Sequence, residues 1–331
     1  MTGSSGSLPR LDYWPIPYPD ETLASVIARW GQRTAHNAKD DVPADIARLP
    51  KFYRSAMDEW LTGFADNLRD GLGIDAADLL WHTSMIPYMC AFRTPSERDA
   101  LLHWGSRQHV LRNRQVLAYA GAKSLFFGVG THETRWCPQC ARAEQSLYGE
   151  SYWHLSHQLP LAFTCSVHGC QLRACPTTSA EFRTLTAALH DKKTAEGDGD
   201  LPVIESPTCV SAVSSWSYAL LARELGPFDP AVLRDIYRDY ATRLFPKSIT
   251  GSGFVNVPDV YEFIGALHKI LGDERKYPAV FETSPDPWQW RLFFAWLRGE
   301  CQPDSNPSAH LRFWLAAGID PQLLPSASVH E

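Results

Sequence analysis

The chain has 331 residues, of which 44% are hydrophobic and 21% are charged, and its formal net charge is −6. This length and apolar content allow about two domains with buried cores, and they exclude a largely disordered protein. The acidic balance excludes a protein whose whole surface binds nucleic acid, so any DNA contact must come from a local basic patch. No apolar run reaches the roughly 18 residues of a membrane span, and the N-terminus lacks a signal-peptide core. We therefore expect a soluble cytoplasmic protein that does not contact a membrane.

The first predicted element is an amphipathic helix in "YPDETLASVIARWGQ". Residues 1–12 are rich in glycine and serine, and we expect a flexible tail that is either native or an artificial addition. Asp20 can cap the helix, and Gly31 is a plausible stop. The buried stripe at the i, i+3, i+4, i+7 positions consists of Leu23, Val26, Ile27 and Trp30.

The next segment predicts two helices joined by a glycine turn. One helix runs from about Ala56 to Asp70 and ends at "GLG", residues 71–73. Asp75 then caps a short helix that contains Leu79 and Leu80. This is the outline of a helix-turn-helix unit, although any small helical bundle contains similar corners. We assign residues 13–130 to an N-terminal helical domain of this type.

A further helix, predicted at about residues 97–120, lies in the most basic part of the chain. Its surroundings offer a candidate nucleic-acid patch, and a solvated helix face is the equal alternative. The basic residues of this segment are Arg93, Arg98, Arg107, Arg112, Arg114 and Lys123.

The middle of the chain, residues 131–190, predicts a zinc-binding domain made of small hairpins. Five of the eight cysteines lie between Cys137 and Cys175, and clustered cysteines without a secretory signal more often bind metal than form disulfides. "WCPQC" places Cys137 and Cys140 two residues apart, and Cys165 and His168 repeat this gap after 24 intervening residues. C-x2-C with C-x2-H makes a closed four-ligand set, which is typical of structural zinc.

Other metal-ligating side chains compete for this role. His154 and His157 fall in the intervening loop, Cys170 is five residues after Cys165, and Cys175 lacks a partner because position 178 is Thr178. We therefore expect one structural zinc per chain and no second one. Structural zinc contributes about 10–16 kcal/mol in small fingers, so we expect it to replace a hydrophobic core in this segment.

Residues 191–207 read as a charged linker, and residues 208–331 predict a C-terminal helical domain. Asp229 and Asp286, each followed by proline, mark two helix starts, and Asp259 marks another. Gly299 is a predicted stop, and a last helix runs from Ser308 to Gly318. The fold class is therefore mainly α, with helical regions on both sides of a zinc-ribbon or zinc-finger segment.

Enzyme motifs are few. The sequence contains no G-x4-G-K-[ST] phosphate loop, no H-E-x-x-H and no G-x-S-x-G. Paired catalytic carboxylates have no local signature, so a metal-dependent nuclease or hydrolase remains an alternative to a protein without enzymatic activity.

Two of these segments resemble one family. "YWPIPYPDETLASVIARWG" resembles the N-terminal signature of TniQ/TnsD proteins, the target-selection components of bacterial transposons that use a separate transposase and an AAA+ ATPase. "RWCPQCARAEQSLYGESYWHLSHQLPLAFTCSVHGCQLRAC" is similar to the zinc segment of the same family. The resemblance covers roughly residues 13–175, and its zinc ligands fall on Cys137, Cys140, Cys165 and His168.

The resemblance implies a bacterial target-selection adaptor that links double-stranded DNA, or a CRISPR effector complex on its target, to the transposon's AAA+ ATPase. Some members of the family act as homodimers. The TnsD-type alternative is direct, sequence-specific recognition of an attachment site.

Overall fold

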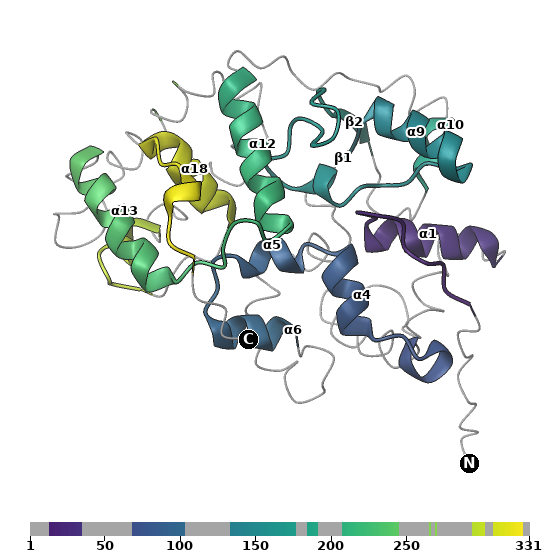
Figure 1. Ribbon diagram of the computed structural model, residues 1–331, viewed down its shortest axis with the longest axis horizontal. Coiled ribbons are helices and arrows are strands. Elements are labelled where there is room, and N and C mark those ends of the chain that lie inside the picture. The colour runs from purple at the N-terminus through teal and green to yellow at the C-terminus, as the bar shows by residue number, and fades with distance from the viewer. Residues whose placement is uncertain are drawn as a thin grey trace, which may run out of the picture.

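The structure is a computed structural model of the chain. It describes residues 13–34, 68–102, 133–176, 184–190, 207–244, 265, 269, 293–301 and 307–326. These residues are mainly helical, and the strands among them form one small sheet (Figure 1). Across these ranges no helix is long and apolar enough to cross a membrane. The elements are α1 Leu23–Arg33, α4 Ala76–Thr83, α5 Ile86–Cys90, α6 Pro95–Leu102, β1 Glu133–Trp136, α9 Pro138–Tyr148, the 3-10 turn η1 Ser156–Gln158, β2 Arg173–Pro176, α10 Leu185–His190, α12 Pro207–Leu221, α13 Pro230–Leu244, α18 Pro307–Ala317 and the 3-10 turn η3 Pro321–Leu323.

Helix α1 buries the stripe that the sequence predicts, but both of its ends differ from the prediction. Thr22, not Asp20, is the N-cap, because its hydroxyl accepts a hydrogen bond from the Ser25 N–H at 3.1 Å. The helix continues through Gly31 to Arg33, since one glycine inside a helix costs only about 1 kcal/mol and tertiary packing outweighs it. Asp20 has a positive φ of 59° and directs its carboxylate elsewhere.

The predicted glycine turn between two helices is present. Residues 68–72 are helical, and Gly73, with a φ of +68°, donates its N–H to the Arg69 carbonyl at 3.0 Å. Asp75 then caps α4 by accepting the Ala77 N–H at 2.8 Å. The earlier part of the helix predicted from Ala56 lies outside the described residues. So do residues 103–120 of the helix predicted at about 97–120, of which α6 is the described part.

Several predicted signals of the C-terminal helices are confirmed, whereas the predicted starts at Asp259 and Asp286 lie outside the described residues. The Asp229 carboxylate accepts the Ala231 N–H at 2.7 Å at the start of α13. Gly299 and Gly318, with φ of +80° and +65°, follow the helical residues 293–297 and α18. Of the helix predicted from Asp259, only positions 265 and 269 are described, and both are helical.

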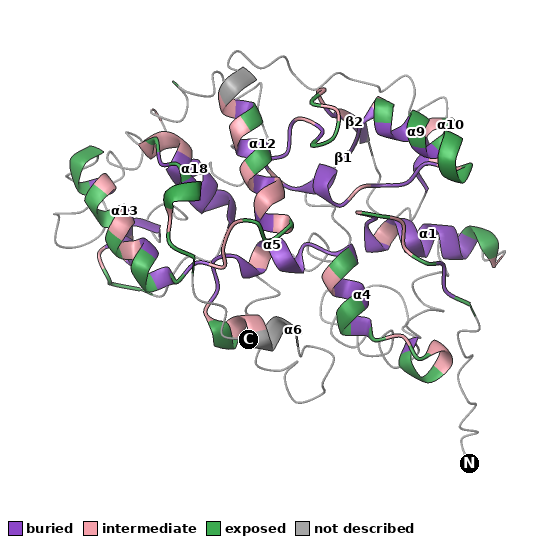
Figure 2. Cartoon of the chain, viewed as in Figure 1, coloured by how far each residue is buried: buried purple, intermediate pink, exposed green. Residues whose placement is uncertain are grey.

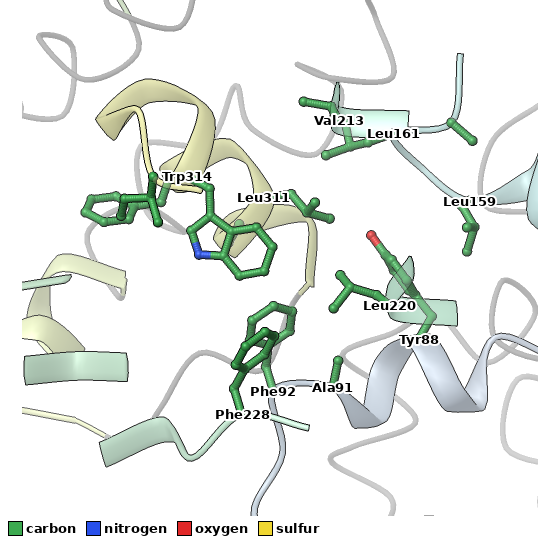
Figure 3. Packing of buried hydrophobic residues seen from close by; sticks show 14 of the residues in the cluster. Tyr88, Ala91, Phe92, Leu159, Leu161, Val213, Leu220, Phe228, Leu311 and Trp314 are labelled. Carbon is green, nitrogen blue, oxygen red and sulfur yellow. The ribbon is translucent and has the colours of Figure 1, made fainter. Parts of the chain in front are cut away.

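One buried cluster joins regions that the sequence analysis separates. Figure 3 shows Phe92 and Phe228 beside Trp314 of α18, and Tyr88 of α5 near Leu220 of α12. The same cluster contains residues of the middle segment, namely Cys137, Cys140, Leu155, Leu159, Leu161, Phe163, Cys165 and Leu172. The domain boundaries stay predictions, but the expectation that zinc replaces a core is wrong. The middle segment contributes aliphatic and aromatic side chains to a core that it shares with α5, α12 and α18.

The burial pattern separates inner helices from outer ones. In Figure 2, α1 is buried along most of its length, whereas α13 alternates between a buried face and an exposed face. The buried face of α13 consists of Pro230, Leu233, Tyr237 and Ala241, as its 3.6-residue period predicts.

Candidate metal centre

The first pair of candidate ligands lies at the start of a helix. Cys137 is the N-cap of α9, Pro138 occupies the first turn, and the Cys137 sulfur accepts the Cys140 N–H at 3.5 Å. The first turn of α9 therefore places both sulfurs on the same side of the helix start. The sequence analysis expected small hairpins here and missed α9, although Pro138 at the start and Gly149, with a φ of +76° at the end, are ordinary helix signals.

The second pair lies in a tight hairpin. A bridge between Thr164 and Gln171 closes it, and the Cys165 N–H donates to the Cys170 carbonyl at 2.8 Å. Gly169 makes the turn with a φ of +63° and donates its N–H back to the Cys165 carbonyl.

The two-stranded sheet brings the pairs together. Strands β1 and β2 are antiparallel, and Trp136 lies opposite Arg173. Cys137 directly follows β1, and the Cys165 hairpin directly precedes β2. The sheet therefore fixes the start of α9 next to the hairpin.

The four candidate ligand atoms converge on one point. All lie within 4.8 Å of one another. The His168 Nδ1 is 3.3 Å from the Cys140 Sγ and 3.5 Å from each of the Cys137 and Cys165 sulfurs, while the Cys140 and Cys165 sulfurs are 3.6 Å apart. In a tetrahedron with bonds of about 2.3 Å to sulfur and 2.0–2.1 Å to nitrogen, the edges are about 3.5–3.8 Å. The residues thus fit one zinc ion, bound through Nδ1 of His168.

Without an ion, two of the three cysteines in the cluster hold their protons tightly. Burial raises the pKa of the Cys137 thiol to about 12. The Cys140 and Cys165 sulfurs share a hydrogen bond, and this contact raises the pKa of Cys140 and lowers that of Cys165. Because metal ligation requires thiolates, a bound cation would displace these protons, and its affinity would fall in acid.

The competing side chains take other positions. The Cys170 Sγ lies 3.3 Å from the Cys137 Sγ but is not one of the four mutually close ligand atoms. Cys175 is buried on β2 in a separate cluster with Trp136. His154 and Glu144 lie within 4.8 Å of Cys140 and could offer ligands, but the His154 Nε2 is 2.5 Å from the Glu144 carboxylate.

The N-terminal segment contacts the chain between the two pairs of candidate ligands. The Asp20 carbonyl accepts the Leu155 N–H at 2.6 Å, and its carboxylate accepts the Ser156 N–H at 3.1 Å. The Thr22 N–H donates to the Trp153 carbonyl at 2.9 Å. A buried ion pair, with 2.7 Å between a guanidinium nitrogen of Arg29 and the Glu21 Oε2, connects α1 to the residues just before it. No local sequence signal predicts the contacts of Asp20 and Thr22, because their partners are more than 130 residues away in the chain.

The candidate nucleic-acid residues have a different status. Arg93 is 3% exposed, so its side chain lies inside the protein rather than on a basic surface. Arg107, Arg112, Arg114 and Lys123 lie outside the described residues. A basic patch in this region therefore stays a prediction.

These features define a mainly helical protein in which the segment that carries a Cys3His cluster contacts both the N-terminal segment and a shared core. Residues 13–172 match the family model of TniQ, and this domain match supports membership of the TniQ family. A TniQ domain implies a role associated with DNA transposition. None of the curated proteins matches the chain significantly.

Proposed function

We propose that the protein is a non-enzymatic adaptor that selects target sites for DNA transposition. It links double-stranded DNA, or an RNA-guided CRISPR effector on its target, to the AAA+ ATPase of the transposon. The observation that carries this proposal is the TniQ match over residues 13–172, a range that contains all four candidate metal ligands. One zinc per chain, held by Cys137, Cys140, Cys165 and His168, keeps the parts of this range in place.

The zinc has a positioning role in this proposal. A closed set of three cysteines and one histidine leaves no coordination position for a substrate water, which is typical of a structural site. The cysteines belong to the buried cluster that also includes α5, α12 and α18, so loss of the ion would disturb surfaces on several helices.

The experiment is reconstituted transposition with the transposase, the ATPase and the target complex encoded beside this gene. We expect insertions at a defined distance from the target when the protein is present, and untargeted or absent insertions when it is omitted. Cys165→Ser should behave like omission, and Cys170→Ser, in the same hairpin, should behave like the unmodified protein. Targeted insertion without the protein would contradict the proposal.

Direct DNA recognition is the second candidate, and the helical pair at residues 68–83 is the observation that favours it, because it has the outline of a helix-turn-helix unit. Against it, α4 contains no lysine or arginine and exposes Asp78. Direct recognition predicts binding to one duplex without partners, weakening steeply with salt. Loss of that binding in folded Arg112→Ala and Arg114→Ala would support it, and no salt-sensitive binding to any duplex would remove it.

The absence of enzymatic activity is also part of the proposal, and it has a simple test. The purified protein is incubated with DNA and Mg²⁺ or Mn²⁺. We expect no cleavage, and reproducible cleavage that disappears when one carboxylate is changed would identify a nuclease instead. We place the protein in the bacterial cytoplasm with its DNA, and sedimentation would show whether it acts as a homodimer.

A further inference from the structure

Cys170 is a thiol at the edge of the candidate metal centre that the metal-ligand assignment leaves without a role. Its sulfur lies 3.3 Å from the Cys137 sulfur and shares a hydrogen bond with it. This distance is shorter than the 3.6 Å between the Cys140 and Cys165 sulfurs, both of which are candidate ligands. Cys137 and Cys170 are therefore two neighbouring thiols of which only Cys137 belongs to the ligand set.

The backbone holds these two sulfurs close together. Cys137 is the N-cap of α9, and its sulfur also accepts the Cys140 N–H. Cys170 lies on the second arm of the hairpin, where its carbonyl accepts the Cys165 N–H at 2.8 Å. A disulfide bond is about 2.05 Å long, so the two sulfurs need to approach by roughly 1.2 Å. Side-chain rotations can supply a shift of this size, so the bond does not require either element to unfold.

Cys170 is also the most exposed cysteine of the group. The structure buries Cys137, Cys140 and Cys165, whereas Cys170 is half-buried. It follows the exposed turn of the hairpin, in which Val167 is 76% exposed. Thiols that react with oxidants are accessible and stand next to a second thiol that completes the reaction. A small oxidant therefore reaches Cys170 first, and Cys137 is the nearest thiol to complete the reaction.

We infer that Cys137 and Cys170 form a reversible disulfide when the protein meets a peroxide, and that this bond removes Cys137 from the metal. The inference rests on the proposed zinc centre and gives that centre a form of regulation. With Cys137 in a disulfide, the site keeps three of its four ligands and is no longer closed. The disulfide joins the start of α9 to the hairpin, so these two parts stay connected when the ion leaves.

The reaction takes place in two steps. The Cys170 thiolate attacks one oxygen of hydrogen peroxide, the O–O bond breaks, and hydroxide leaves and takes up the proton that the thiol released. Cys170 is then a sulfenic acid. The Cys137 thiolate attacks the Cys170 sulfur, the S–S bond forms, and the hydroxyl group leaves as water after taking a proton. The two sulfurs lose two electrons in total, and hydrogen peroxide is reduced to two water molecules. A dithiol reverses the change by thiol–disulfide exchange.

The experiment uses the full chain, purified with a reductant, loaded with zinc and then freed of the reductant. Hydrogen peroxide is added, a colorimetric chelator records zinc release, and the remaining thiols are blocked before digestion with trypsin. Trypsin cleaves after Arg142, which places Cys137 and Cys140 in one peptide and Cys165 and Cys170 in another. Fragment ions that separate the two cysteines of each peptide identify the linked pair.

We expect the unmodified chain to lose its zinc and to contain a link between Cys137 and Cys170. Dithiothreitol and fresh zinc should restore the zinc content. Cys170→Ser should keep its zinc at a peroxide dose that empties the unmodified chain, because a hydroxyl group forms no disulfide. Cys301→Ser, which changes an exposed cysteine outside the ligand cluster, is the matched control and should lose its zinc like the unmodified chain.

Each result decides the inference. Zinc release from Cys170→Ser at the rate of the unmodified chain would overturn it, and so would a link between Cys140 and Cys165 or no zinc release at all. If Cys170→Ser does not fold, the linked peptides of the unmodified chain give the answer. A purified chain without zinc before peroxide is added would instead contradict the proposed zinc centre, and the linked peptides would then decide the disulfide separately.

Discussion

The Asp20 Oδ2 lies 3.2 Å from the His154 Nδ1, although 134 residues separate them in the chain. The other imidazole nitrogen of His154 is 2.5 Å from the Glu144 carboxylate of α9. One charged histidine thus joins the segment before α1 to the first helix of the metal centre. This relationship gives the N-terminal segment a fixed place that its own sequence does not specify.

Replacing Asp20 by asparagine should destabilise the protein. Asparagine tolerates the positive φ of 59° at this position, so the change removes the charge without adding backbone strain. It weakens the bonds to His154 and to the Ser156 N–H, and we expect a loss of about 1–3 kcal/mol in the free energy of unfolding. Urea unfolding followed by tryptophan fluorescence measures this. Asp78→Asn, at an exposed position of α4, is the matched control, and equal effects of the two changes would contradict the docking role of Asp20.

The stabilising effect of His154 should depend on pH. Burial alone would lower the pKa of His154, but Asp20 and Glu144 raise it to about 9 from an ordinary value of about 6.5. Because the pKa of His154 is raised in the folded protein, the protonated imidazole stabilises the fold fully below pH 6.5. This contribution to the free energy of unfolding, on the order of 3 kcal/mol, is lost as the pH rises through 9. The difference in unfolding free energy between the unmodified chain and His154→Gln should therefore be large near pH 6 and small near pH 10. The same difference at both pH values would show that the charge of His154 contributes nothing.

Removing the Phe92 ring should weaken the metal centre as well as the helical core. Phe92 is 1% exposed, and its ring stacks on His310 with 3.8 Å between centroids. Phe92→Ala should cost about 3–5 kcal/mol. Because the cluster that contains Phe92 also contains Cys137 and Cys165, fluorescence change and metal release should shift to lower urea concentration together. Val232→Ala on the exposed side of α13 should shift neither, and a shift of fluorescence alone would indicate separate domains.

Local signals in the sequence predict several of the described helix boundaries and the candidate ligands. Asp75 and Asp229 cap their helices as expected, because each carboxylate accepts a hydrogen bond from the backbone N–H two residues further along the chain. The two C-x2 pairs predict the ligand cluster because the chemistry of zinc restricts both residue type and spacing.

Long-range contacts explain where local signals fail. Asp20 and Thr22 are both acceptable caps, and the distant residues His154 and Ser156 decide between them. The shared core was not expected because the aliphatic side chains at residues 155–163 show no helical or strand period, and their partners lie on α12 and α18. The sequence analysis placed Arg93 among the candidate nucleic-acid residues, but Arg93 is buried. The charge of a residue does not reveal whether its side chain is buried.

The central claim is that Cys137, Cys140, Cys165 and His168 hold one zinc ion within the core of a TniQ protein. The direct test is X-ray absorption at the zinc edge together with the zinc content of the purified chain. We predict one zinc per chain with three sulfur ligands and one nitrogen ligand, retained in Cys170→Ser and lost in Cys165→Ser. A zinc content of zero or two, or a four-sulfur site that Cys170→Ser disrupts, would contradict the account.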